Sequence, residues 1–393
     1  MRIAVIDADL VGRKAHRFPN LVCMKFSGYY KSLGHEVVLK LDYKDLETFD
    51  MVKISKVYTD TPCPESVLEL DNVEYGGTGF FFDKASDLPS DIEHFMPDYH
   101  LYDEWVQKEK ERGINPLQFD YYENASIGSL TRGCFRKCEF CVNRKYNTIE
   151  KHSPLTEFLD SSRRFIILTD DNFMAYPFWK VLLKELEKTK KQFFFTQGLD
   201  IRLLTEEAAE QFSKASYKGD FIFAFDHLKD RELIESKLNM WRKYASGHTK
   251  LYVFSGFDYD NKYDEKFWVE DIIGVFERIK ILMVHGCYPY MTRFVKYNES
   301  PYRGMYITLC RWCNQPSFLK KKSFREFCTD AYKSGQEKAI YEYMCDFEKK
   351  YPDIASQYFD IKFSELNQYP STRKPGRPPK IKIQEPVLET KGE

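Results

Sequence analysis

One short loop constrains this chain more than any other stretch. In the run TRGCFRKCEFCVN, three cysteines stand at a C-x3-C-x2-C spacing, namely Cys134, Cys138 and Cys141. Thiolates this close in sequence can converge on one soft metal centre without help from distant parts of the fold. A structural zinc site closes with four protein ligands, and an iron–sulfur cube is normally held by four cysteines. The spacing therefore predicts a metal or cluster site with one coordination position left for another ligand.

Basic side chains surround the three cysteines, against the single acid Glu139. They are Arg132, Arg136, Lys137, Arg144 and Lys145. A positive field favours thiolates and offsets the negative charge of a thiolate-ligated cluster. The alternatives, a zinc knuckle or unrelated buried thiols, remain open at this stage.

The composition indicates a large soluble protein. The chain has 393 residues, of which 43% are hydrophobic and 16% aromatic, enough for two or three domains. Its net charge of −1 gives no global field for nucleic acid or an anionic membrane. The start, MRIAVIDADL, lacks the features of a secretory signal, and no run approaches the roughly 18 apolar residues of a membrane span. Ten cysteines without an export signal favour a reducing compartment, so we expect a cytoplasmic location.

The first part of the chain alternates apolar strands with helices. Strands are expected at 2–7, 36–41, 50–58 and 73–77, and helices at 19–33 and 65–70. This alternation predicts a Rossmann-like, doubly wound α/β domain. Ligands of such domains lie at the carboxyl ends of the strands, here near 7–12 and 76–79.

A second α/β region comes after the cysteines. Six strands are expected at 125–130, 164–170, 192–197, 220–226, 250–256 and 286–294. Amphipathic stretches such as 178–188 and 206–215 lie between them. Six strands with intervening helices predict a partial (β/α)6 TIM-like barrel.

With Phe140 directly before the last cysteine, the C-x3-C-x2-C loop resembles the signature of the radical S-adenosylmethionine (radical SAM) family. The resemblance implies that the three cysteines bind a 4Fe–4S cluster whose open iron chelates S-adenosylmethionine. It implies reductive cleavage to methionine and a 5′-deoxyadenosyl radical that acts on an unknown substrate, by methylthiolation, methylation or rearrangement. It also implies a radical SAM barrel and a one-electron donor such as flavodoxin or ferredoxin.

Polar residues end each expected strand, where barrel enzymes place their chemistry. The candidate cofactor-binding residues are Phe140, Asp170, Asp171, Asn172, Gln197, Asp226, Ser255 and Arg293. In the family, the position of Asp170 to Asn172 carries a Gly-Gly-Glu motif that holds the amino group of S-adenosylmethionine. The residues differ here, although carboxylates suit an ammonium group. Each candidate is open to the alternative of a solvated loop charge or a helix cap.

The N-terminal part resembles the cobalamin-binding-like domain of many radical SAM proteins. The fingerprint D-x-H-x-x-G meets Asp7 to Gly12, with Asp9 at the place of the axial histidine. A hard carboxylate replaces imidazole poorly on cobalt. Bulky residues, Phe80 to Phe82, also come after the GGTG turn at the strand end. We therefore expect cobalamin to be unlikely here, and this domain to help shape the substrate entrance.

A second cysteine pair, Cys310 and Cys313, lacks a further ligand pair at ribbon-like spacing, and buried thiols are the expected state. The other function class is a zinc-stabilised nucleic-acid-binding protein without catalysis, in which this pair joins Cys138 and Cys141.

The expected organisation has five parts. They are 1–90 Rossmann-like, 91–120 linker, 121–320 barrel, 321–369 helical extension and 370–393 a disordered, basic, Pro-rich tail. The GRP core of the tail resembles an AT-hook, so a nucleic-acid contact there is the alternative to a solvated tail.

Overall fold

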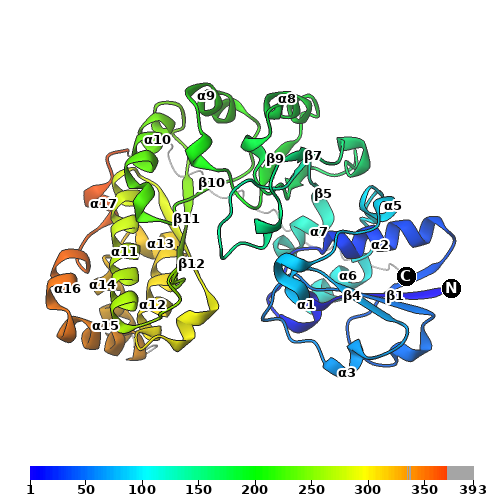
Figure 1. Cartoon of the computed structure of the whole chain (residues 1–393), viewed down its shortest axis with the longest axis horizontal. Coiled ribbons are helices and arrows are strands. Elements are labelled where there is room, and N and C mark those ends of the chain that lie inside the picture. Colours follow the sequence, from blue (N-terminus) through cyan, green and yellow to red (C-terminus); the bar gives the residue numbers. More distant parts are fainter. Residues whose placement is uncertain (334, 336–337, 370–393) are drawn as a thin grey trace, which may run out of the picture.

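The computed structural model describes residues 1–333, 335 and 338–369, and it is an α/β protein built on parallel sheets (Figure 1). The N-terminal sheet has the order β2-β1-β3-β4, and all its pairs are parallel. Its strands are β1 (Arg2–Asp7), β2 (Glu36–Leu39), β3 (Met51–Ser55) and β4 (Val73–Gly76). Its helices are α1 (Ala8–Gly12), α2 (Leu21–Ser32), α3 (Glu65–Leu68), α4 (Thr78–Phe81) and α5 (Ser90–Glu93). Strand order reverses between β1 and β3, as in doubly wound folds.

The segment 91–120 is not the linker that the sequence suggested. It contains α6 (Asp103–Glu111), and a short 3₁₀ turn then leads to α7 (Asp120–Asn124). Its buried aromatic residues share a core cluster with Val5, Cys23 and Met24, and they are Tyr99, Tyr102, Trp105, Phe119 and Tyr122. The linker prediction is wrong because these rings supply the apolar surface that covers β1 and α2.

Six parallel strands come next, in two sheets of three. One sheet is β5 (Ala125–Gly128), β8 (Phe165–Leu168) and β9 (Gln192–Phe195); the other is β10 (Phe221–Ala224), β11 (Thr249–Ser255) and β12 (Tyr288–Arg293). Isolated parallel bridges, Phe193 to Tyr217 and Leu199 to Phe223, lead from the first sheet toward the second. Each of the six predicted strands is present. A short antiparallel pair, β6 (Thr131–Arg132) with β7 (Glu150–Lys151), closes the base of the cysteine loop.

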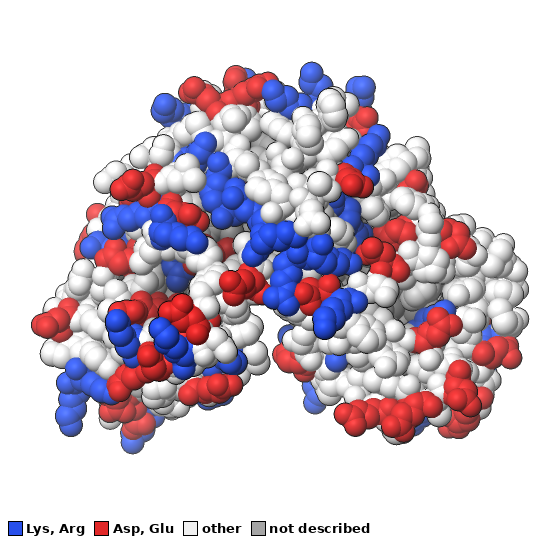
Figure 2. Space-filling model, viewed as in Figure 1, with Lys and Arg blue, Asp and Glu red and all other residues white. Residues whose placement is uncertain are grey.

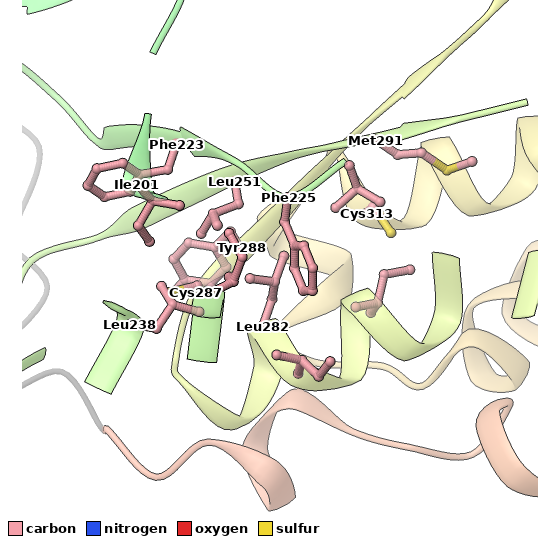
Figure 3. Packing of buried hydrophobic residues seen from close by; sticks show 14 of the residues in the cluster. Ile201, Phe223, Phe225, Leu238, Leu251, Leu282, Cys287, Tyr288, Met291 and Cys313 are labelled. Carbon is pink, nitrogen blue, oxygen red and sulfur yellow. The ribbon is translucent and has the colours of Figure 1, made fainter. Parts of the chain in front are cut away.

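Helices cover the outer face of these strands because alternate strand residues are apolar. Leu251 and Val253 of β11 are buried, as is Phe223 of β10. Figure 3 shows Leu251 and Phe225 near Leu238 and Leu282, which come from the covering helices. The helices after the cysteine loop are α8 (Trp179–Lys188), α9 (Glu206–Lys214), α10 (Arg231–Tyr244), α11 (Glu265–Val284), α12 (Arg303–Cys313), α13 (Pro316–Leu319), α14 (Phe324–Lys333), α15 (Lys338–Lys350), α16 (Pro352–Tyr358) and α17 (Phe363–Leu366).

Among the helices of the described residues, none combines the length and apolar character needed to cross a bilayer. The predictions about the tail at 370–393 lie outside the described residues.

Candidate functional site

The three cysteines of the loop are free, partly exposed thiols. The backbone N–H groups of Arg136 and Asn143 point at the sulfurs of Cys134 and Cys141, each at 3.4 Å. The side-chain amide of Asn172 also lies 3.5 Å from the Cys134 sulfur. Hydrogen bonds to sulfur are among the features that tune protein-bound iron–sulfur clusters.

The turn after β8 holds the strand that leads into this loop. Asp170 accepts hydrogen bonds from the backbone N–H of Thr131 (2.6 Å), its hydroxyl (2.6 Å) and the N–H of Leu130 (3.2 Å). Asp170 is fully buried, and burial raises its pKa to about 7 although the hydrogen bonds from Thr131 and Leu130 act in the opposite direction. Its oxygens therefore serve the fold, and the predicted role in binding an amino group is not supported by its placement.

Asp171 holds the two ends of the cysteine loop together. Its carboxylate accepts a hydrogen bond from the backbone N–H of Gly133 at 2.8 Å and another from the Asn143 side-chain amide at 2.7 Å. These two partners flank the three cysteines in the sequence. One carboxylate thus joins the entry and the exit of the loop.

The loop entry also needs a glycine. Gly133 has φ +102°, and a Cβ there would lie 2.3 Å from the carbonyl oxygen of Thr148. A side chain would be strained by the backbone angle and would collide with the segment that leads into β7. Close approach of the two loop ends depends on this residue.

A charged network links the loop to the carboxyl end of β9. Arg136 contacts Asp200 at 2.8 Å, and Arg202 contacts the same carboxylate at 2.7 Å. Asp200 is 7% exposed at its side chain. Asp200 and Arg202 belong to the run QGLDIR after β9, and Arg136, which is remote in the sequence, connects them to the cysteine loop.

Burial affects the pKa of two loop thiols more than the surrounding basic residues do. It raises the pKa of Cys138, while Arg202 and Arg136 act to lower it. It also raises the pKa of Cys141. Arg136 thus acts in the direction expected from the sequence, but burial outweighs it at Cys138.

A second charged network joins the loop to the N-terminal part. Glu93 contacts Lys25 at 3.0 Å, Arg132 at 3.1 Å and His152 at 3.2 Å. Burial acts to raise the pKa of Glu93, but the hydrogen bond from His152 and the two cations outweigh it and lower the pKa to about 2. Figure 2 shows Lys and Arg side chains gathered in the middle of this face.

Phe140 and Asp226 extend the site toward β10 and β11. The ring of Phe140 packs on Phe254, with centroids 4.2 Å apart. Asp226 and Phe254 line a cavity of about 270 Å³, together with Tyr259. Burial raises the pKa of Asp226, opposed by Arg278 and Arg202. The cysteine loop, Phe140 and this cavity thus meet at the carboxyl ends of the strands.

The remaining candidates from the sequence are Ser255, Arg293 and Gln197. Ser255 also lines the cavity, but its hydroxyl donates to the Thr292 carbonyl at 3.0 Å. Arg293 lies over the ring of Tyr297 at 4.3 Å. Gln197 is exposed after β9. The structure therefore gives Ser255 and Arg293 structural contacts and does not bring Gln197 into the cavity.

Arg278 is a buried residue near the site that was not predicted from the polar residues at the strand ends. Its guanidinium donates to the carbonyl oxygens of Asp226 (2.8 Å), Phe254 (2.8 Å) and Phe225 (3.2 Å). It therefore ties the ends of β10 and β11 together beneath the cavity. The available signal was a single arginine among the apolar positions of the face that α11 buries.

Within the described part of the chain, no three or more His, Cys, Asp or Glu residues are grouped to hold a single metal ion. A cube takes one cysteine on each iron, so its ligands stand further apart than those of one ion. Cys310 contacts the Met291 carbonyl at 3.6 Å and the Asn314 amide at 3.2 Å, and Cys313 is buried. Cys313 is therefore a buried thiol of α12, whereas Cys310 is partly exposed.

Comparisons with known proteins give matches among solved structures alone. No protein-family model and no curated protein matches the chain. One match is OxsB, a cobalamin-dependent S-adenosylmethionine radical enzyme, with aqua-cobalamin bound: 11% identity, TM-score 0.33, and coverage of 94% of this chain and 58% of that chain. Another is apo, selenomethionine-labelled OxsB, with 12% identity, TM-score 0.36 and the same coverage. The chain thus spans less than two thirds of that protein.

The names of these matches bear on two expectations. Both are described as radical S-adenosylmethionine enzymes, the family that the cysteine loop resembles. Both are also cobalamin-dependent, and one has aqua-cobalamin bound. This finding contradicts the expectation that cobalamin is unlikely, and that expectation is withdrawn.

Proposed function

We propose that this chain is a radical SAM enzyme in which Cys134, Cys138 and Cys141 hold a 4Fe–4S cluster. The observation that carries the proposal is that the turn after β8 holds the cysteine loop through hydrogen bonds. Asp171 fixes both loop ends, so three free thiols are held at the carboxyl edge of parallel strands. Six strands in chain order support the interpretation of 121–320 as a partial (β/α)6 barrel.

The residues present suit such a cluster. Thiolates are the usual ligands of iron–sulfur clusters, and N–H donors already point at two of the three sulfurs. Asn172 adds an unused acceptor, since its Oδ1 is buried without a partner among the described residues. Because Asn172 also contacts Cys134, we assign this oxygen to the amino group of S-adenosylmethionine in place of Asp170.

When bound, this pair of cofactors supplies a 5′-deoxyadenosyl radical by one-electron cleavage of S-adenosylmethionine. The chain's own contribution is binding, orientation and exclusion of water. Phe140, packed on Phe254, places apolar rings beside the cavity that Asp226 lines. We assign that cavity to the adenosine portion, with Asp226 as a hydrogen-bond acceptor.

The electron must reach the loop from outside. Arg144 and Lys137 are exposed at the loop surface. An acidic one-electron donor such as flavodoxin or ferredoxin is the partner that we propose for this surface.

The test is anaerobic reconstitution and then iron and sulfide analysis. The wild type should bind about four irons and four sulfides, and a triple Cys→Ala variant of the loop should keep its fold but bind none. Cys310→Ala, which changes a partly exposed cysteine outside the loop, should load normally. With dithionite and S-adenosylmethionine, the loaded wild type should form 5′-deoxyadenosine. Stoichiometric zinc without sulfide would reject the proposal in favour of the zinc-stabilised nucleic-acid-binding protein.

A further inference from the structure

The inner faces of the two three-stranded sheets are covered differently. Phe18, Leu21 and Tyr121 pack with Ile127 and Phe165 of the first sheet, so the N-terminal part fills that face. In β11 of the second sheet, Thr249, Leu251, Val253 and Ser255 are buried. The alternate residues Lys250, Tyr252 and Phe254 point the other way and are less covered. The second half of the strand array therefore keeps an open inner face.

A groove of about 810 Å³ lies between the loop after α1 and β12. We call it the Tyr58 groove; it is lined by Arg13, Lys14, His16, Arg17, Tyr58 and Tyr290, among others. Figure 1 shows α1 facing β12 across the space between the two lobes, and Figure 2 shows this face hollowed between them. The volume falls within the range of small-molecule sites.

Aromatic rings form the walls of the Tyr58 groove. Tyr58 and Tyr290 are 45% and 38% exposed, so both rings have surface free for a ligand. Asp9 accepts hydrogen bonds from the backbone N–H groups of Val57 (2.7 Å) and Tyr58 (3.3 Å), which fixes one wall. Tyr252 packs edge-on against Tyr290 at 5.7 Å, which supports the other.

The charges in the groove are mainly positive. Arg13 lies 4.5 Å over the Tyr58 ring and pairs with Asp60 at 2.7 Å. Lys14 is exposed. Arg17 donates through Nη1 to the carbonyl oxygens of Lys14 (3.1 Å) and His16 (2.6 Å), whereas its buried Nε has no partner among the described residues. Asp60 is the one carboxylate among the lining residues, so three cations face a single anion there.

We propose that the Tyr58 groove binds a nucleoside phosphate, as a free nucleotide or as part of a single strand. Flat exposed rings beside an excess of two positive charges suit a base and its phosphate together, because bases stack on aromatic faces while Arg and Lys take the phosphate. An uncharged apolar ligand would leave this excess charge without an anion, and a simple anion would leave the rings uncovered.

The groove leads toward the cysteine loop. Tyr290 pairs with Tyr252 in the register of β11 and β12. Phe254 lies two residues further along β11, about 7 Å away, and contacts Phe140 of the loop. The inference deepens the proposed function by naming the substrate class, and it rests on that function only for the chemistry after the nucleotide has bound.

The test is a binding titration on the full-length, cluster-loaded protein. The probes are a fluorescent analogue of thymidine monophosphate and a short fluorescein-labelled single-stranded DNA. A pyrimidine is used so that the adenosine cavity does not compete. Tyr290→Leu should weaken binding about tenfold, because it removes a stacking surface. Lys14→Glu should weaken it about fivefold at low salt and reduce the salt dependence.

Two control variants match these changes. Tyr75→Leu alters a tyrosine that is 39% exposed and lies outside the groove. Lys184→Glu reverses an exposed lysine of α8. Neither should change binding. The inference is supported if either probe binds saturably and both groove variants weaken that binding. The probe that binds more tightly shows whether the site takes a free nucleotide or a single strand.

Absence of saturable binding by the wild type, or equal binding by groove and control variants, would overturn the inference. Iron and sulfide content is measured on the same samples. A loaded protein that binds no nucleotide leaves the proposed function standing, whereas a protein without a cluster that binds through the groove refutes only the proposed function.

Discussion

Asp171 accepts a hydrogen bond of 2.7 Å from the side-chain amide of Asn143, two residues beyond the last cysteine of the loop. The same carboxylate holds Gly133, directly before the first cysteine. The cysteine loop is thus closed by a residue of β8's terminal turn, about 30 positions further along the chain. Asp171 therefore restrains the loop at both of its ends.

Asp171→Ala should loosen the loop more than it destabilises the protein. It removes two hydrogen bonds that hold the loop ends, each with a net contribution to stability of about 0.5–1.5 kcal/mol. We expect anaerobically loaded Asp171→Ala to lose most of its iron on desalting, with a small fall in Tm. Asp87→Ala, at an exposed ion pair with Lys145, serves as the control and should retain iron. Equal iron retention by the two variants would contradict the role of Asp171.

Gly133→Ala should damage the loop through steric collision. The added Cβ would lie 2.3 Å from the Thr148 carbonyl oxygen. Gly113→Ala is the matched control, because Gly113 also has positive φ, at +87°, but has nothing within 4 Å of an added Cβ. The control should lose about 1 kcal/mol from backbone strain alone. Gly133→Ala should lower the free energy of unfolding, measured in urea, by clearly more than the control does, and it should fail to load iron. Similar losses of stability in both variants would show that the contact with Thr148 has no effect.

Glu93 should make part of the stability depend on pH. Its pKa is lowered from 4.5 to about 2 in the folded protein, so its contribution is complete above pH 4.5 and is lost as the pH falls toward 2. With the side chain 15% exposed, this contribution is on the order of 3 kcal/mol. Glu93→Gln should lower the free energy of unfolding by about that amount at pH 6.

The difference between wild type and Glu93→Gln should narrow below about pH 4.5, since a protonated glutamate resembles glutamine. Urea unfolding at several pH values measures it. Glu104→Gln, at an ion pair with 83% side-chain exposure on the glutamate, should show almost no effect at any pH. A Glu93→Gln difference that stays constant from pH 6 to 3 would rule out the ionised carboxylate as its source.

Local patterns were enough to predict the strands and to single out the cysteine loop, but not the contacts between distant segments. Apolar runs such as FIIL in β8 indicate a buried strand by themselves. The bond from Asp170 to Thr131 depends on β5 and β8 being neighbours, which no local pattern encodes. For the same reason, Asp170 was assigned to a ligand rather than to the loop.

The prediction of a linker at 91–120 failed for a related reason. Tyr99, Tyr102 and Trp105 stand among prolines and acids without helical or strand periodicity, so the segment was interpreted as a connector. Their rings instead complete the N-terminal core. Arg278 was overlooked because a charge inside an apolar helix becomes meaningful only when its three carbonyl partners are known.

Arg278→Met should destabilise the protein strongly, although methionine keeps much of the side-chain volume. The change leaves the carbonyl oxygens of Asp226 and Phe254 without their donor, and it leaves the buried Asp271 without a nearby cation. Removing one partner of a buried charged pair costs about 3–5 kcal/mol, so Tm should fall by on the order of 5–10 °C. Arg231→Met, at a side chain that is 51% exposed, should change Tm little. Differential scanning fluorimetry compares the two variants, and a loss of similar size in both would show that the buried arginine does not hold the ends of β10 and β11 together.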